Sequence, residues 1–332
     1  MLNPQLKLNT KFFGKDTEMA PIRKGFGEGL LEVAKKDARV VGLCADLTES
    51  TYMHLFKKEF PERFVEIGVA EQNLASVASG MSAMGKIPVI SSYAVFSPGR
   101  NWEQIRTTIC LNNRKVIIAG SHGGVSVGPD GATHQALEDI AIMRALPNMA
   151  VLTPCDATEA KKAIIEAVKW STPVYIRLAR EKTPIMTTYD TPFEIGKAET
   201  FFSSPSADGN KQIGIIAGGT LLSEALWAGK ELADSGMGVE VVNIGTIKPI
   251  DKDAILRLAE RSAGIVTVEE HQASGGLGGA VAEVLSEHYP LPMRFVAVKN
   301  VFGQSGRPDE LIRHYGLDKE SIKRAVRELE GG

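Results

Sequence analysis

Cysteine, excess charge of either sign and long apolar runs are scarce in this sequence, and each shortage argues against a class of protein. The 332 residues include three cysteines, too few and too scattered for a disulfide framework or a zinc site: Cys44, Cys110 and Cys155. Lysine plus arginine number 38 against 40 acidic residues, so the formal net charge is −2. A nucleic-acid-binding or membrane-surface protein would need a clear excess of basic residues, and we therefore expect neither.

Apolar segments that could target or anchor the chain are missing as well. No apolar run approaches the roughly 20 residues that a membrane-spanning helix needs. The segment from Met1 to Asn9 lacks the apolar stretch of a signal peptide. We therefore expect a cytoplasmic protein with no membrane partner. At about 150 residues per domain, the length predicts two domains.

What the chain does have is an alternation of short apolar segments, rich in Val and Ile, with amphipathic segments of helix length. The expected strands are residues 39–43, 87–91, 116–120, 150–153, 174–178, 213–217, 239–243, 265–269 and 294–298. The expected helices include residues 21–36, 71–84, 102–111, 156–170 and 319–329. Asp156 followed by Glu159 has the outline of a capping box. This alternation predicts an α/β fold whose sheets are mainly parallel and flanked by helices.

The alternation lapses between residues 181 and 211, where prolines, a serine-rich run and Asp208-Gly209-Asn210 replace any helical pattern. We interpret this stretch as an interdomain connection that carries one or two short strands. The boundary near it predicts two domains, residues 1–185 and 186–332.

Glycine-rich segments are candidate ligand sites. Gly275–Gly279 follows an expected strand, but it lacks the G-x-G-x-x-G spacing, so we interpret its glycines as allowing close strand–helix packing. The segment Gly120–Gln135 contains more side chains that could bind a ligand or transfer a proton, because it brings two histidines and an aspartate to the carboxyl end of an apolar strand. Ligands of open α/β sheets bind at that end, so this loop predicts a functional site.

Several motifs together resemble the transketolase family. They occur in order along nearly the whole chain: Ile22-Arg23-Lys24, Ala45-Asp46-Leu47-Thr48, Gly68-Val69-Ala70-Glu71-Gln72, the 122–135 loop, Arg180 and Phe302-Gly303-Gln304-Ser305-Gly306. The resemblance implies a thiamine-diphosphate-binding pyrimidine domain in residues 1–185, followed by a transketolase C-terminal domain in residues 186–332. It implies transfer of a two-carbon ketol unit from a ketose phosphate to an aldose phosphate.

One large part of a full-length transketolase is missing. The chain contains no Gly-Asp-Gly, the start of the family's motif for the divalent metal and the cofactor's diphosphate. The chain therefore resembles the C-terminal section of a split transketolase. The resemblance implies no metal ligands here, and a partner chain with the diphosphate-binding domain that mainly holds Mg²⁺ or Ca²⁺. It also implies a homodimer of this chain within a heterotetramer.

The resemblance assigns cofactor-binding roles to four residues. Glu71 matches the family glutamate that hydrogen-bonds the aminopyrimidine ring, so it is a catalytic residue as well. Phe96 and Tyr93 match the aromatic segment that packs on that ring. Asp46 matches a residue near the cofactor and the subunit interface. A third aromatic that the family commonly has is absent, because the chain reads Ser97-Pro98-Gly99-Arg100 there.

Further matches concern the sugar phosphate. His122 and His134 match catalytic positions that meet the substrate, since histidine can transfer protons near neutral pH. The other matches to substrate-binding positions are Asp130, Arg180, Arg23 and Ser50. Arginine suits phosphate because its planar guanidinium can donate two parallel hydrogen bonds.

Two alternative functions stay open. A transketolase-like enzyme or one like 1-deoxyxylulose-5-phosphate synthase could act on another sugar, although that synthase family usually lacks a histidine at the position of His122. A non-catalytic subunit could keep the fold, although joint retention of five residues speaks against it: Glu71, His122, Asp130, His134 and Arg180. The Asp130–Gln135 string is not expected in the beta subunits of 2-oxo acid dehydrogenases.

Overall fold

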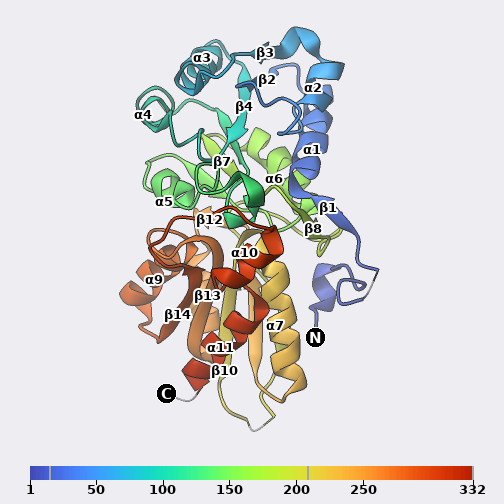
Figure 1. Cartoon of the computed structure of the whole chain (residues 1–332), viewed down its shortest axis with the longest axis vertical. Coiled ribbons are helices and arrows are strands. Elements are labelled where there is room, and N and C mark those ends of the chain that lie inside the picture. The colour runs from blue at the N-terminus through green and yellow to red at the C-terminus, as the bar shows by residue number, and fades with distance from the viewer. Residues whose placement is uncertain (15, 208, 331–332) are drawn as a thin grey trace.

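The computed structural model describes residues 1–14, 16–207 and 209–330, which form two lobes lying end to end (Figure 1). Both lobes have a sheet with helices packed on it, and both sheets are mainly parallel. The expected α/β fold is therefore confirmed. None of the described helices is long and apolar enough to cross a bilayer. The three cysteines are free and buried.

The N-terminal lobe is built on a seven-stranded sheet. Its strands are β2 (Val40–Cys44), β3 (Phe64–Glu66), β4 (Ile87–Tyr93), β5 (Ile117–Ser121), β6 (Ala150–Leu152), β7 (Val174–Arg177) and β12 (Thr246–Lys248). They lie in the order β12–β6–β7–β5–β4–β2–β3, and all pairs are parallel except β12 with β6. Central strands such as β2 and β5 are buried along their whole length, which explains their continuous apolar sequences.

Helices cover this sheet, and the sequence pattern anticipates the three longest of them but neither of the two six-residue helices. They are α1 (Ile22–Lys36), α2 (His54–Glu59), α3 (Glu71–Ala83), α4 (Trp102–Gln104), α5 (Asp139–Arg144) and α6 (Ala157–Lys169). The N-cap half of the predicted capping box is present, because Asp156 Oδ1 accepts the Glu159 N–H at 2.8 Å, but the Glu159 carboxylate accepts the N–H of Cys155 rather than that of Asp156. The packing of α1 on α6 requires glycine, since a Cβ at Gly25 would lie 1.7 Å from the Ala157 carbonyl oxygen.

One expected helix has a different geometry. Residues 102–111 form the short α4 and then a π-helical segment, Ile105–Cys110. The hydroxyls of Thr107 and Thr108 donate to carbonyls four residues earlier, at 2.9 and 2.7 Å. Such back-bonding competes with the regular helical ladder, which the apolar spacing alone does not reveal.

The C-terminal lobe contains a five-stranded sheet. Its strands are β9 (Glu199–Ser204), β10 (Gln212–Ala217), β11 (Val239–Asn243), β13 (Ser262–Gln272) and β14 (Met293–Val298), in the order β14–β13–β10–β11–β9. Its helices are α7 (Leu222–Asp234), α8 (Lys252–Arg261), α9 (Leu277–His288), α10 (Pro308–His314) and α11 (Lys319–Glu330). Only β9 is antiparallel to its neighbour.

The chain crosses between the lobes more than once. The connecting stretch holds two short strands as predicted, β8 (Lys182–Pro184) and β9, and β8 pairs with β1 (Met19–Pro21). The first residues run back to the C-terminal lobe, where Leu6 and Phe12 are buried in its core. In the other direction, β12 adds an edge to the N-terminal sheet. The two lobes are therefore joined by shared structure as well as by the linker.

Candidate functional site

Tyr93 is the last residue of β4, and Phe96 lies in the tight turn that follows it. Ser97-Pro98 is a cis peptide. A Cβ at Gly99 would lie 1.9 Å from the Val95 carbonyl oxygen, so the turn requires glycine at this position. The turn ends at the fully buried Asn101, whose amide donates to the Ser97 hydroxyl at 3.1 Å.

Glu71 begins α3 and lies beside this loop. Its carboxylate is almost buried, and Oε1 accepts a hydrogen bond from Arg100 Nη1 at 3.1 Å. Its backbone carbonyl accepts the Asn101 amide at 2.9 Å. The side chains around it line an open groove, which we call the Glu71 groove: Val69, Ala70, Glu71, Gln72, Asn73 and Arg100.

Tyr93 and Phe96 meet both histidines of the glycine-rich segment. The rings of Tyr93 and His122 stack with centroids 3.7 Å apart. The Phe96 ring meets His134 edge-on at 5.3 Å and lies 5.8 Å from Tyr93. One face of Tyr93 is thus covered by His122, whereas Phe96 reaches toward Arg100, whose guanidinium carbon lies 4.1 Å from the ring centre.

His122 is held in an unusual state. It has a left-handed backbone with φ of 58°, and its Nδ1 lies 2.7 Å from the Ser121 hydroxyl. Burial, reinforced by the nearby Arg23 and Arg180 guanidinium groups and by His134, lowers the pKa of His122 to about 2. The imidazole is therefore neutral at physiological pH and can donate or accept a hydrogen bond there.

Two arginines lie next to this imidazole. Arg23, in the first turn of α1, donates to the Ser50 carbonyl and to the Arg180 carbonyl, the latter at 2.7 Å. Arg180 follows β7 and donates to the Val127 carbonyl at 3.1 Å and to Glu181 at 2.9 Å. Burial lowers the pKa of Arg23, and its Nε has no hydrogen-bond partner within the described part of the chain. A buried guanidinium with an unused donor suits an anionic ligand.

The structure thus brings most of the residues singled out from the sequence into one row of contacts. The row begins at Glu71 and passes through Arg100 and Phe96 to the histidines and Tyr93. Arg23 and Arg180 complete it electrostatically, since both lower the pKa of His122. Ser50 belongs to it through its carbonyl oxygen rather than its hydroxyl.

Two of the predicted residues stand apart from this row. Asp46 is exposed in a left-handed turn after β2, and its N–H donates to Glu66 at 2.7 Å. Asp130 is exposed at the end of a short 3₁₀ segment, Val125–Asp130. Within the described part of the chain, neither carboxylate contacts the row, so their predicted roles stay predictions.

Sequence reasoning missed a buried polar cluster between the lobes, which we call the interdomain seam: Asp139, Tyr175, Arg177, Glu269, Glu270 and His271. Arg177 Nε donates to Asp139 at 2.9 Å and its Nη2 to the Glu270 carbonyl at 2.8 Å. The Tyr175 hydroxyl donates to the same Asp139 carboxylate at 2.6 Å. Glu269 to His271 lie at the end of β13, and all three are buried and hydrogen-bonded.

The seam holds the histidine-bearing loop from the C-terminal side. Glu270 Oε1 accepts the Ser126 N–H at 2.5 Å, and Gln135 donates to the Gln304 carbonyl at 3.0 Å. Burial raises the pKa of Glu270, an effect that Arg177 opposes. An acidic pair at the end of an otherwise apolar strand was the signal in the sequence, since buried carboxylates need partners.

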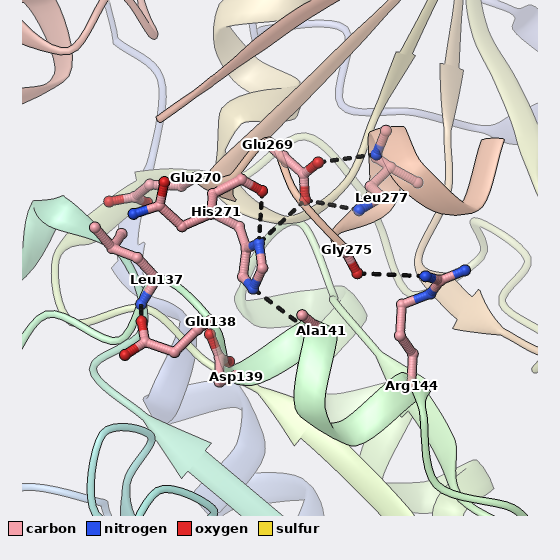
Figure 2. Close-up of polar contacts among 12 residues, drawn as sticks. Leu137, Glu138, Asp139, Ala141, Arg144, Glu269, Glu270, His271, Gly275 and Leu277 are labelled. Atoms are coloured by element: carbon pink, nitrogen blue, oxygen red, sulfur yellow. Dashed lines mark hydrogen bonds and ion pairs between the residues drawn. The ribbon is translucent and has the colours of Figure 1, made fainter. Parts of the chain in front are cut away.

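The Gly275–Gly279 segment also belongs to this region. Glu269 accepts the N–H groups of Leu277 and Gly278 at 2.7 and 2.8 Å, and a Cβ at Gly276 would lie 2.0 Å from its Oε2. Figure 2 shows His271 between Glu269 and Ala141, whose N–H lies 3.4 Å from the imidazole Nε2. The start of α9 is therefore occupied by a protein carboxylate. Close packing explains Gly275, Gly276 and Gly278, whereas a Cβ at Gly279 would meet no atom within 4 Å.

Metal ligands form no cluster in the part of the chain that is described. Among residues 1–14, 16–207 and 209–330, no group of three or more His, Cys, Asp or Glu side chains is arranged to hold a metal ion.

Comparisons with known proteins match both lobes. The family model "Transketolase, pyrimidine binding domain" matches residues 18–186, and "Transketolase, C-terminal domain" matches residues 206–322. A protein of Methanocaldococcus jannaschii, described as "Putative transketolase C-terminal section", is 44% identical over 92% of this chain and 95% of its own length. The 6-deoxy-6-sulfo-D-fructose transketolase subunit SqwH of a Clostridium species is 37% identical over 93% of this chain and 94% of that subunit.

A solved structure is similar over the same extent. The "Split gene transketolase, inactive beta4 tetramer" has a TM-score of 0.86 and 41% sequence identity, and the match covers 93% of this chain and 98% of that one.

Proposed function

This chain belongs to the transketolase family, and from that premise we propose that it is the C-terminal subunit of a split transketolase. In this proposal it transfers a two-carbon ketol unit from a ketose phosphate to an aldose phosphate, with thiamine diphosphate as cofactor. The observation that carries the proposal is the row of contacts from Glu71 to Arg23 and Arg180. It offers a carboxylate at one end, aromatic rings and imidazoles in the middle, and two guanidinium groups at the other.

The arginine end of the row suits the anionic group of a sugar. Arg23 and Arg180 both lower the pKa of the neutral His122, Arg23 donates to the Arg180 carbonyl at 2.7 Å, and Arg23 Nε has no hydrogen-bond partner among the described residues. Two guanidinium groups can bind a phosphate or a sulfonate in a geometry that a lysine would not fix. Because one relative is named for a sulfo-sugar, the test includes such a donor.

The Glu71 end suits the aminopyrimidine ring of the cofactor. Within the described residues, Glu71 Oε1 is bonded to Arg100 while Oε2 accepts no hydrogen bond, and the side chain lines an open groove. A carboxylate with a free oxygen can hydrogen-bond a ring nitrogen, and Phe96 offers an aromatic ring for packing. When bound, thiamine diphosphate supplies the electron sink for carbon–carbon bond cleavage. Glu71 then holds a proton at the pyrimidine ring, while His122 and His134 serve the substrate's hydroxyls.

The diphosphate and its metal belong to a second chain in this proposal. Gly-Asp-Gly is absent from the sequence, and two relatives are named as a section and a subunit of transketolases. We expect Mg²⁺ or Ca²⁺ to be held mainly by that partner, and two copies of this chain to assemble with two partner chains. The similarity to a split-gene tetramer supports assembly of this kind of chain.

The decisive experiment reconstitutes the assembly. The chain is tagged and captured from its source cells with its partner, and the complex is assayed with xylulose 5-phosphate and ribose 5-phosphate, with and without thiamine diphosphate and Mg²⁺. A parallel assay replaces the donor with 6-deoxy-6-sulfo-D-fructose. We expect cofactor-dependent turnover of the complex and none of the isolated chain.

The two donors separate the alternatives. Turnover with the sulfo-sugar alone would keep the chemistry and change the substrate. A complex with its partner that turns over neither donor would move the search to other sugars, whereas a chain that captures no partner and shows no cofactor dependence would overturn the proposal and favour the non-catalytic subunit.

A further inference from the structure

Arg100 makes the one side-chain contact that holds the Glu71 carboxylate, as far as the structure describes the chain. Nη1 lies 3.1 Å from Oε1, and the two side chains differ greatly in exposure, at 51% for Arg100 and 5% for Glu71. A half-exposed ion pair contributes little to folding, typically about 0–1 kcal/mol. Its significance is therefore more in where it puts the carboxylate than in how much it stabilises the fold.

The same guanidinium also lies over the Phe96 ring, with 4.1 Å between its carbon and the ring centre. That distance is within the range of a cation–π interaction. Arg100 thus joins the carboxylate and the aromatic ring that the proposed function assigns to one heterocycle. It stands in the stretch where the sequence lacks the third aromatic residue of the family.

The backbone around Arg100 is fixed. Asn101 ties the loop to the Glu71 carbonyl at 2.9 Å, and Gly99 allows the turn that no larger residue could make without displacing Val95. Arg100 therefore reaches Glu71 from a constrained position rather than from a mobile loop, which is what a positioning role requires.

We propose that Arg100 is the positioning residue of this site. It fixes Glu71 through Oε1 and covers Phe96, so that Oε2 is the carboxylate oxygen left for the ring nitrogen of a flat heterocycle. The inference rests on the proposed function for the identity of that heterocycle. It rests on the structure alone for the ion pair.

The first test uses the complex with its partner chain and compares Arg100→Met, Arg100→Lys and Arg106→Met. Arg106 is an exposed residue of the same segment and serves as the matched control. We expect Arg100→Met to lower kcat at least tenfold and to raise the half-saturating concentration of thiamine diphosphate. Arg100→Lys should restore part of the loss, because it keeps the charge without the planar group. Arg106→Met should match the parent chain.

A double variant distinguishes positioning of Glu71 from a purely structural role of Arg100. In a Glu71→Gln background, Arg100→Met should add no further loss of kcat if Arg100 acts through that carboxylate. An undiminished tenfold loss in that background, or unchanged kinetics of Arg100→Met in the parent chain, would overturn the proposal.

The second test does not depend on ketol transfer. In the isolated full chain, the ¹⁵N resonance of the Arg100 guanidinium is compared between the parent, Glu71→Gln and the exposed control Glu103→Gln. We expect a shift with Glu71→Gln and none with Glu103→Gln. No shift in either would overturn the ion pair, whereas a shift without turnover of the complex would count against the proposed function only.

Discussion

The interdomain seam and the Glu71 groove treat their polar groups in opposite ways. In the seam, Asp139 receives hydrogen bonds from Arg177 and Tyr175, and its side chain is only 1% exposed. In the groove, Glu71 is also nearly buried, yet its only side-chain partner within the described residues is the half-exposed Arg100.

The difference shows which buried charged groups find all their partners within this chain and which do not. A buried charge is tolerated when its partners are fixed, and the seam supplies those partners from both lobes of one chain. In the groove, one Glu71 carboxylate oxygen accepts no hydrogen bond from the described residues, and an open surface lies beside it. We therefore expect a ligand from outside this chain to bind there. We therefore expect changes in the seam to act on folding and changes in the groove to act on turnover.

The largest effect should come from breaking the seam with Arg177→Met. The change leaves the Asp139 carboxylate buried without its cation, which typically costs about 3–5 kcal/mol in free energy of unfolding. Denaturant unfolding of the isolated chain at one protein concentration measures it. Arg307→Met, which removes the cation of an exposed pair with Asp309, is the control and should change stability by less than about 0.5 kcal/mol. A loss below about 1 kcal/mol for Arg177→Met would contradict the comparison.

The groove should respond in the other way to Glu71→Gln. We expect kcat of the reconstituted complex to fall at least about 100-fold, because a positioned acid–base group commonly contributes that much. The free energy of unfolding should change by less than about 1 kcal/mol, since only a half-exposed ion pair is lost. The control is the exposed Glu103→Gln. A variant that keeps most of its turnover would end the assignment of Glu71.

Substitution of Glu270, a residue of the interdomain seam that bonds the histidine-bearing loop, tests whether the seam also affects substrate binding. Glu270→Ala removes the acceptor for the Ser126 N–H and leaves that buried group unpaired, at a cost of about 1–3 kcal/mol. Because Ser126 belongs to the loop with His122 and His134, the KM for the sugar donor should rise as well. Unchanged KM in a destabilised variant would show that the seam does not position the loop.

The smallest expected effect is the contribution of His122 to the pH dependence of folding stability. The pKa of His122 is about 2 in the folded chain against 6.5 ordinarily, so between these values the unfolded state binds more protons. Stability therefore falls as pH drops below about 6.5, and this one group accounts for about 1 kcal/mol between pH 6.5 and 5.5. His122→Asn should remove that part of the slope in unfolding measured at both pH values. An unchanged slope would show that His122 is accessible to protons in the fold.

Much of the fold was accessible from the sequence because its signals are local. Val- and Ile-rich runs predicted strands that the structure places within a residue or two, as at β4 and β11, except that β13 extends three residues beyond its predicted range at each end. The sequence also predicted the Asp156 N-cap and the glycines that allow close packing. The π-helical segment was not, because threonine back-bonding leaves the apolar spacing unchanged.

The sequence predicted individual residues of the candidate site but not which of them contact one another. The order of motifs pointed to Glu71, Phe96, His122, His134 and the two arginines. It gave no reason to place Asp46 and Asp130 outside the row, because exposure depends on how the turn after β2 and the 3₁₀ segment lie. It also gave no partner for Arg100 or Arg177.

By itself, the sequence determined the alternation of elements, the family resemblance and the residue types available for chemistry. Only the tertiary structure decided that Arg100 meets Glu71 across 29 residues and that Arg177 meets Asp139 across 38. The physical reason is that hydrophobic periodicity and caps act over a few residues. The pairing of buried charges, by contrast, depends on which strands lie side by side, and that order is set by packing of the whole chain.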